Sequence, residues 1–273
     1  MEIGMFTSGY QRNSLKEVFK DGKRFGYDFI ELWGARPHGY PFDLKDGSID
    51  EIKELIQRYE IPIKGYTPEM NAYPYNMMIG TESMRKDSID YIKLSMDMAK
   101  ELGAEFTLIS AGHAGYKATT KEIWDRLIKC IKEIADYAEK IQHTVVLEPL
   151  TPYESNVVTT ANDLAQVFRM VSSPYLVGMC DVVAPYVQYE SIMTYFDKLG
   201  DKMYHMHIVD SDGSSDNHIM PKEGKMPLKE LIMELKEINY DKTMTIELVT
   251  SYINEPSLYS RRAITNLKSL LTD

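Results

Sequence analysis

The sequence contains little cysteine: Cys130 and Cys180 are the only two in 273 residues. Two cysteines cannot form a disulfide framework, and no CxxC pair offers a thiolate metal site. Long apolar runs are also missing, since no stretch approaches the roughly 18 residues that span a bilayer. The N-terminal MEIGMFTSGYQRN lacks the basic and apolar regions of a secretory signal. We therefore expect a soluble, cytoplasmic protein with no membrane partner.

Positive charge is scarce as well. The chain has 31 Lys and Arg against 41 Asp and Glu, which gives a net charge of −10. This balance disfavours a nucleic-acid or membrane-surface binder, because phosphate contacts need a basic face. Hydrophobic residues at 44% and charged residues at 26% are typical of a globular protein. The length fits one large α/β domain or two small ones.

Short hydrophobic segments rich in β-branched and aromatic residues recur along the chain at a fairly steady interval. Their hydrophobicity is nearly continuous, which is typical of buried parallel strands, whereas half-exposed antiparallel strands alternate. Each segment ends in polar or glycine-bearing residues. We predict eight strands, at residues 3–7, 29–33, 61–66, 106–110, 144–148, 176–181, 204–209 and 244–249.

The segments between these strands have helical signals. Ile89, Ile92 and Met96 repeat at three- and four-residue spacing, and Gly103 follows where a C-terminal cap belongs. We predict eight helices, at residues 15–25, 49–59, 84–102, 121–141, 161–171, 189–199, 228–238 and 257–271.

Eight strands that alternate with eight helices give about 34 residues per unit, which is the length of a βα repeat. No Ser/Gly/Pro linker or change of composition divides the chain. We therefore predict an α/β fold in which residues 1–273 form one domain, a single closed (β/α)₈ barrel. A doubly wound open sheet is the alternative, but no GxGxxG turn follows the first strand.

Ionisable side chains end four successive predicted strands, and in a barrel these strand ends converge on one mouth. The segment VVLEP carries Glu148, VGMCD ends in Asp181, and MTIELV carries Glu247. Between the last two, YHMHIVD carries His205 and His207. Because the intervals are close to one βα unit, each strand would deliver one ligand to the same mouth.

Three carboxylates and one imidazole at a common centre form an oxygen-rich site for a divalent cation. If no cation lay between them, the carboxylates would repel one another. The set suits Mn²⁺, Mg²⁺ or Co²⁺ better than a thiolate-preferring ion, and it is compatible with Zn²⁺. Singly, each residue has a plainer explanation, such as a helix cap or, for His205, a core histidine or a group supporting His207. Four such residues in phase favour the metal site.

Further polar side chains follow the strands on the same predicted face. The loop GYTPEMNAYPYNMMIG carries Glu69, Tyr73, Tyr75 and Asn76, and its aromatic density suits a wall or lid around a polyhydroxylated ligand. A loop ordered by proline, with its tyrosines at the surface, is the alternative.

The other loops at this face also carry candidates. His113 follows the fourth strand, and Glu154 follows Glu148. Glu154 could bind a sugar hydroxyl or a metal-bound water, or it could cap a loop. The loop after the seventh strand carries Asp216 and His218, together with Asp212, Lys222 and Lys225, which we interpret as solvated surface.

The strand endings LEP, CD, HIVD and IEL together resemble those of the xylose-isomerase-like TIM barrels. That family includes ketose 3-epimerases, sugar-phosphate isomerases and endonuclease-IV-type DNA repair enzymes. Long runs such as ELWGARPH, GYTPEMNAYPYNMM and LEPLTPYESNVV are similar to those of members that epimerise Amadori sugars, in which C1 of a ketose carries an amine. The similarity extends over essentially the whole chain.

The resemblance implies one divalent metal held by Glu148, Asp181, His207 and Glu247, with the two glutamates also acting as the acid/base pair at C3. The chain departs from the free-ketose epimerases at two positions. Those enzymes carry a histidine three residues after the metal aspartate and an arginine six residues after the metal histidine. Here the positions hold Ala184 and Gly213, so the substrate end of the pocket differs.

The endonuclease-IV-type members hold three metals. His113, Asp216 and His218 match some of their additional ligands, whereas Ala184 removes another. The acidic balance of the chain also disfavours a DNA partner. We therefore predict substrate contacts instead, at His113, Glu154, His218 and Tyr66.

Three functions follow from these patterns. The favoured one is a metal-dependent 3-epimerase of an Amadori sugar, and thus of an amino-sugar substrate. The second is an isomerase or epimerase of another sugar or of a sugar phosphate, with Arg36, Lys222 and Lys225 around the phosphate. The third is an abasic-site endonuclease, which needs a three-metal cluster and a basic groove. Family members differ in native metal and in oligomeric state, so a homo-oligomer is compatible with all three.

Overall fold

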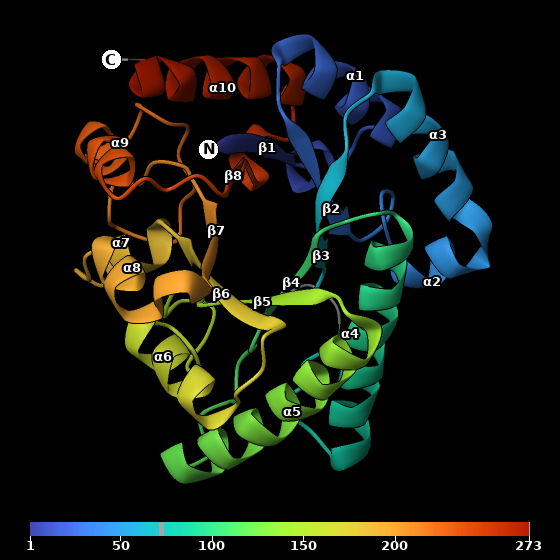
Figure 1. Cartoon of the computed structure of the whole chain (residues 1–273), viewed down its shortest axis with the longest axis vertical. Coiled ribbons are helices and arrows are strands. Elements are labelled where there is room, and N and C mark those ends of the chain that lie inside the picture. Colours follow the sequence, from blue (N-terminus) through green and yellow to red (C-terminus); the bar gives the residue numbers. More distant parts are fainter. Residues whose placement is uncertain (71–73, 273) are drawn as a thin grey trace.

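Eight parallel strands close into a barrel in the computed structural model, which describes residues 1–70 and 74–272 (Figure 1). Each strand pairs with the next in sequence, and the last pairs with the first. The predicted (β/α)₈ barrel is therefore confirmed. The strands are β1 (Glu2–Phe6), β2 (Phe29–Gly34), β3 (Ile63–Pro68), β4 (Phe106–Ser110), β5 (Thr144–Glu148), β6 (Leu176–Asp181), β7 (Met203–His207) and β8 (Thr243–Ile246).

Helices connect the strands and surround the barrel (Figure 1). They are α1 (Leu15–Phe25), α2 (Pro41–Asp43), α3 (Ile49–Tyr59), α4 (Glu82–Glu101), α5 (Thr120–Ile141), α6 (Ala161–Met170), α7 (Val183–Val187), α8 (Met193–Leu199), α9 (Leu228–Glu237) and α10 (Pro256–Thr272). Shorter helical turns are η1 (Thr7–Tyr10), η2 (Leu44–Ser48), η3 (Gly200–Lys202) and η4 (Thr250–Tyr252).

Local sequence signals explain where several helices begin and end. Ser14 and Glu17 form a capping box at the start of α1, and Thr119 and Glu122 form another at α5. Each box satisfies backbone N–H groups that have no partner within the helix. After α4, Gly103 has φ 80°, a left-handed conformation that suits a C-terminal cap, as predicted.

The connection between β6 and β7 differs from the prediction of one helix over residues 189–199. The short helix α7 comes first, and α8 begins only at Met193. Between them Tyr189 has φ 58°, a left-handed backbone conformation that interrupts a right-handed helix. The apolar spacing of this segment therefore predicted the second half of the helix correctly and its beginning wrongly.

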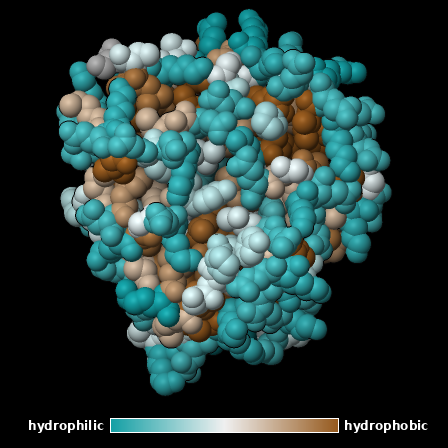
Figure 2. Space-filling view, in the orientation of Figure 1, coloured by the Kyte–Doolittle hydropathy of each residue, from teal (hydrophilic) through white to brown (hydrophobic). Residues whose placement is uncertain are grey.

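Apolar side chains fill the barrel below its mouth. Phe106, Leu108, Val146, Val177 and Met179 form a buried cluster contributed by β4, β5 and β6. A larger buried cluster lies between the strands and the helices. On the face shown in Figure 2, hydrophilic residues cover most of the outer surface, with hydrophobic residues in the hollows between them. The interior is thus a packed core, which leaves the polar strand ends at its mouth.

The lengths and composition of the helices show whether any of them could cross a membrane. Among the helices within residues 1–70 and 74–272, none is both long enough and apolar enough to cross a bilayer. The longest, α5 with 22 residues, carries charged side chains along its length.

Candidate active site and metal centre

Four side chains from successive strand ends meet at the mouth of the barrel. Glu148, Asp181 and His207 are the last residues of β5, β6 and β7, and Glu247 directly follows β8. Asp181 and His207 are register partners in adjacent strands, which places them at the same height. One ligand atom from each of the four residues lies within 4.8 Å of the others. The chain thus brings together the four residues named as metal ligands.

His207 presents a buried nitrogen to this group. Its Nδ1 lies 2.8 Å from Glu247 Oε2 and 3.3 Å from Glu148 Oε1. It nevertheless makes no hydrogen bond of suitable geometry to any described residue. A buried polar atom in this state costs free energy, and a cation among the carboxylates would relieve that cost. The donor set therefore fits a divalent metal ion.

Glu31, which no sequence pattern indicated, lies behind His207. Its Oε1 accepts a hydrogen bond from His207 Nε2 at 3.1 Å, and its Oε2 accepts one from His205 Nε2 at 3.1 Å. Thr67 Oγ1 donates to Oε1 at 2.6 Å. Gly65 makes room for this carboxylate, since a Cβ there would lie 2.9 Å from Glu31 Cγ. With a proton held on Nε2, His207 keeps its Nδ1 lone pair for a metal.

Glu31, His205 and His207 also lie close enough together to hold a metal themselves. Both carboxylate oxygens of Glu31 already accept hydrogen bonds from the two rings. The remaining nitrogen of His205, Nδ1, pairs with Thr243 Oγ1 at 2.8 Å. Because Glu31 and both ring nitrogens of His205 already have partners, we assign these two residues as the support of His207, which was one of the two explanations offered for His205.

We expect Glu31→Gln to weaken metal binding by roughly 10- to 100-fold, which is the usual effect of losing a group that orients a metal-bound histidine. The amide has only one acceptor oxygen and cannot fix both rings as the carboxylate does. Calorimetric titration with Mn²⁺ measures the change. The matched control is Thr107→Val, which removes the buried 2.9 Å contact with His143 away from the mouth. Wild-type affinity in the Glu31 variant would show that His207 needs no such support.

The two glutamates have opposite electrostatic environments. Burial raises the pKa of Glu148 to about 7. Burial also acts to raise the pKa of Glu247, but His207 and His218 outweigh it and hold that pKa well below its usual range. A pair of carboxyl groups with separated pKa values is typical of an acid and a base that work together.

The pKa of His207 is itself shifted. Burial acts to lower it, but the surrounding carboxylates of Glu247, Glu31 and Glu148 raise it well above the usual value. Before a metal binds, the ring therefore carries the positive charge that partly balances these carboxylates.

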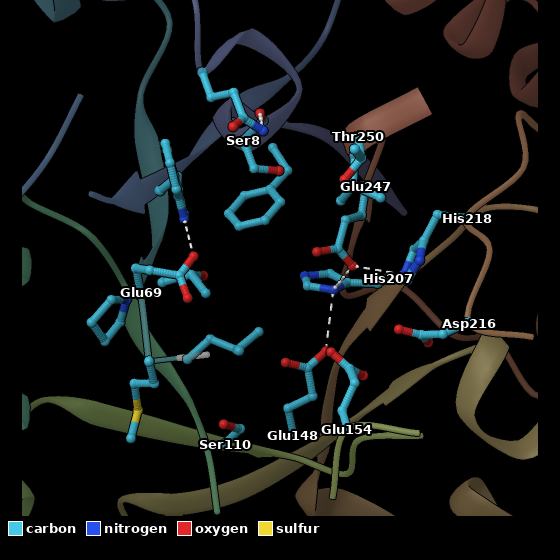
Figure 3. Close-up of a pocket in the computed structure, with 18 residues that line it drawn as sticks. Ser8, Glu69, Ser110, Glu148, Glu154, His207, Asp216, His218, Glu247 and Thr250 are labelled. Atoms are coloured by element: carbon cyan, nitrogen blue, oxygen red, sulfur yellow. Dashed lines mark hydrogen bonds and ion pairs between the residues drawn. The ribbon is translucent and has the colours of Figure 1, made fainter. Parts of the chain in front are cut away.

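A cavity of about 410 Å³ opens above this group. Its volume lies within the range of small-molecule sites. Among the described residues, the lining includes no lysine and no arginine. It includes five carboxylates, which come from Glu69, Glu148, Glu154, Asp216 and Glu247 (Figure 3).

Two of the predicted substrate contacts, Glu154 and His218, line this cavity. His218 Nε2 lies 3.0 Å from Asp181 Oδ2 and 3.2 Å from Glu247 Oε2, so it touches two of the four candidate ligands. Burial, followed by the nearby charge of Asp216, raises the pKa of Glu154 to about 8. Both residues therefore lie where a bound molecule would meet them.

The other two, Tyr66 and His113, lie outside the lining of the cavity. In β3 the side chains alternate, and Thr67 faces the barrel interior, so Tyr66 faces the helices. It is fully buried, and its O–H donates to Gly39 O at 2.5 Å. His113 Nδ1 accepts a hydrogen bond from Gly115 N at 2.9 Å. This arrangement does not support a contact between either residue and the substrate.

The loop after β3 supplies one wall of the cavity through Glu69, whose Oε2 accepts a hydrogen bond from Trp33 Nε1 at 2.8 Å. Tyr75 instead stacks on Tyr91, with ring centroids 3.9 Å apart. Tyr73 lies outside the described residues. Tyr75 therefore packs against α4 and does not form part of an aromatic lid over the cavity.

Comparison with known proteins gives the family. The xylose isomerase-like TIM barrel family matches residues 19–270 of the chain. The chain belongs to this family. It is 55% identical over 273 residues to the fructoselysine 3-epimerase of Escherichia coli O157:H7, a match that covers 100% of this chain and 99% of that relative. This full-length relationship makes the chain a sugar epimerase, an enzyme of the isomerase class.

Solved structures of other proteins share the fold. A D-psicose 3-epimerase from Clostridium cellulolyticum H10, with D-tagatose, superposes with a TM-score of 0.81 at 18% identity and covers 99% of both chains. The IOLI protein with a bound zinc atom superposes with a TM-score of 0.84 at 21% identity, over 100% of this chain and 98% of that one.

Proposed function

We propose that this chain is a metal-dependent 3-epimerase that interconverts fructoselysine and psicoselysine. The proposal rests above all on Glu148 and Glu247, which lie on either side of His207 and both line the cavity (Figure 3). A sugar bound in front of His207 would have a carboxyl group toward each face of one carbon. The 55% identity to a fructoselysine 3-epimerase supports the choice of substrate.

Epimerisation at C3 removes the proton from a carbon next to the C2 carbonyl and returns a proton to the opposite face. One glutamate accepts the C3 proton, the C3–H electron pair forms the C2–C3 double bond, and the carbonyl electrons move to O2 to give an enediolate. The other glutamate, which starts protonated, donates its proton to the other face of C3 while the carbonyl re-forms. A single base would return the proton to the side it came from.

Each glutamate is expected to contribute roughly 10²–10⁴ in rate as a positioned acid or base. Which glutamate acts as the base depends on the direction of the reaction. After one turnover the glutamate that accepted the C3 proton is protonated and the other is ionised. In the metal-free chain the two carboxyl groups differ, since burial raises the pKa of Glu148 to about 7 while His207 and His218 hold that of Glu247 well below its usual range despite burial.

Glu148, Asp181, His207 and Glu247 would hold one divalent cation. Bound there, the ion supplies a Lewis acid that polarises the C2 carbonyl and stabilises the charge that develops on O2. Three carboxylates and one imidazole favour Mn²⁺, Mg²⁺ or Co²⁺, and the zinc atom of the related IOLI structure keeps Zn²⁺ among the candidates.

The charge of the cavity favours an amino sugar over a sugar phosphate. The three basic residues considered for a phosphate do not line it. Arg36 pairs with Asp43 at 2.6 Å, and Lys222 Nζ donates to Ser269 Oγ at 3.1 Å. Fructoselysine instead brings a secondary amine that is protonated near neutral pH. The same acidic lining disfavours the phosphates of abasic DNA.

Proton NMR in D₂O tests this proposal with purified protein, Mn²⁺ and three kinds of substrate: free ketoses, phosphorylated ketoses and fructoselysine. We expect deuterium at C3 of fructoselysine together with the appearance of psicoselysine, and no reaction in a chelated sample. Exchange at C3 of a phosphorylated ketose alone would contradict the substrate. Cleavage of abasic DNA by the same protein would contradict the reaction class.

We also propose that residues 1–273 form one domain. The strands nearest the two ends, β1 and β8, pair with each other, and α1 packs against α10. The first and last parts of the chain therefore complete the same barrel.

A further inference from the structure

The loop between β7 and α9 is a built structure that carries two polar side chains into the cavity. An antiparallel bridge closes its base, where Asp210 N donates to Ile219 O at 2.7 Å and Ile219 N donates back at 2.8 Å. The buried Asp210 carboxylate accepts further backbone N–H groups of this loop. Gly224 permits this packing, because a Cβ there would lie 2.3 Å from Asp210 Oδ1. The loop thereby fixes Asp216 and His218.

Two buried atoms at this loop have no hydrogen-bond partner among the described residues: Asp216 Oδ1 and His218 Nδ1. Both residues line the cavity, and the His218 side chain is only 8% exposed. In Figure 3 the Asp216 carboxylate points toward Glu154 and His207. Buried polar atoms without partners are rare in folded proteins, and in a cavity wall they indicate a ligand that brings the missing partners.

Asp216, whose Oδ1 is the acceptor without a partner, and Glu154 are two acidic side chains on either side of one hydroxyl, that of Thr151. Thr151 Oγ1 donates to Glu154 Oε2 at 3.2 Å, and the Asp216 carboxylate lies near the same hydroxyl. Thr151 is 1% exposed, and its hydroxyl has a single proton to donate. It cannot serve both carboxylates at once. A positively charged donor with two N–H groups would match this arrangement.

We propose that Asp216, with Glu154 beside it, binds the protonated secondary amine on C1 of the substrate. This assignment rests on the proposed function, which supplies the substrate class. When O2 and O3 face the His207 group, C1 lies one bond from C2, so its nitrogen lies beside that group and not across the cavity at Glu69. A secondary ammonium carries two N–H groups and one positive charge, which two neighbouring carboxylates accept as charge-assisted hydrogen bonds.

This arrangement makes Asp216 a specificity-determining residue. A free ketose has a neutral hydroxyl on C1, which donates one hydrogen bond and brings no positive charge to the pair. A phosphate on C1 would be repelled outright. Discrimination of this kind is large, because a site built for a donor penalises the analogue that lacks it.

The test compares Asp216→Asn with the wild-type protein on two substrates. One is fructoselysine, and the other is its neutral analogue in which an ether oxygen replaces the C1 amine. We expect the substitution to lower kcat/KM for fructoselysine by roughly 10- to 100-fold and to leave that for the ether nearly unchanged. The matched control is Asp212→Asn in the same loop. Asp212 Oδ1 accepts from Ser214 N at 2.9 Å and lies outside the cavity lining, so the wild-type preference should persist.

The outcomes distinguish the proposed function from the assignment of Asp216. A wild-type protein that does not epimerise fructoselysine would overturn the proposed function itself. If the wild-type protein does epimerise fructoselysine, two results would overturn the assignment of Asp216. The Asp216→Asn variant would either keep the full preference for the amine or lose activity on both substrates equally. If that variant is too unstable to assay, competitive inhibition of the wild type decides. Equal inhibition by unreactive C1-amino and C1-ether sugars would then refute an ammonium site.

Discussion

Glu247→Gln is expected to lower kcat for 3-epimerisation by roughly 10²–10⁴-fold, because the amide can neither accept nor donate the C3 proton. The carboxyl group of Glu247 is ionised at neutral pH, since His207 and His218 hold its pKa well below the usual range despite burial. Glu148→Gln should cause a loss of similar size from the other face of the sugar. Rates come from NMR of fructoselysine and psicoselysine, with metal content measured in parallel.

Deuterium exchange shows whether each glutamate works on one face. With one acid or base removed, the remaining glutamate can still exchange the C3 proton of one epimer with solvent without producing the other. We therefore expect exchange without epimerisation, in opposite epimers for the two variants. Glu133→Gln, on the outer helix α5, is the control for the same chemical change away from the mouth. Near-normal turnover in Glu247→Gln, with exchange at C3, would refute the two-base scheme.

The candidate ligands could be predicted because the barrel imposes their convergence. Parallel strands end at one mouth, so four ionisable residues spaced by about one βα unit must meet there once the fold is known. Glu31 had no such pattern. It lies in the middle of an apolar strand, and its partner His205 is 174 residues away in the sequence. The one local signal was a lone carboxylate inside the hydrophobic run FIELWG, which is unusual unless the charge is paired.

Side-chain direction limited the other predictions. Tyr66 follows the alternation of β3 toward the helices, and a shift of one residue would have turned it into the barrel. Likewise, the segment before α8 has apolar spacing suited to a helix, yet Tyr189 adopts a left-handed conformation that the spacing does not reveal. Asp216 was named as a candidate of its loop but not as a substrate contact, because the bridge between Asp210 and Ile219 that directs it inward forms only in three dimensions.

Removing the divalent ion with a chelator is expected to abolish epimerisation and to lower Tm, and adding Mn²⁺ should restore both. The four candidate ligands include three carboxylates that lie within 4.8 Å of each other and of His207. Without a cation, their repulsion is balanced only by protons on the group and on His218. At a free metal concentration 100 times Kd, binding would add about 2.7 kcal/mol to the free energy of unfolding. Full activity after chelation would refute a metal-dependent reaction.

Metal affinity should rise with pH through neutrality. Burial raises the pKa of Glu148 to about 7, and the surrounding carboxylates raise that of His207 well above its usual value despite burial. Both groups therefore hold protons in the metal-free chain at lower pH, and a metal ion must displace them to bind. Calorimetric titrations at pH 7 in buffers of different ionisation enthalpy measure the protons released, and we expect about one or two per metal ion.

Glu148→Gln provides the matched control for this pH dependence. The amide has no proton to lose, so the variant should bind metal more weakly and release fewer protons at pH 7. Heats that do not depend on the buffer in the wild-type protein would contradict the argument. Glu148, whose proton opposes metal binding at low pH, is also one of the two proposed acid/base residues, so the pH dependence of metal binding reports on a residue of the two-glutamate reaction.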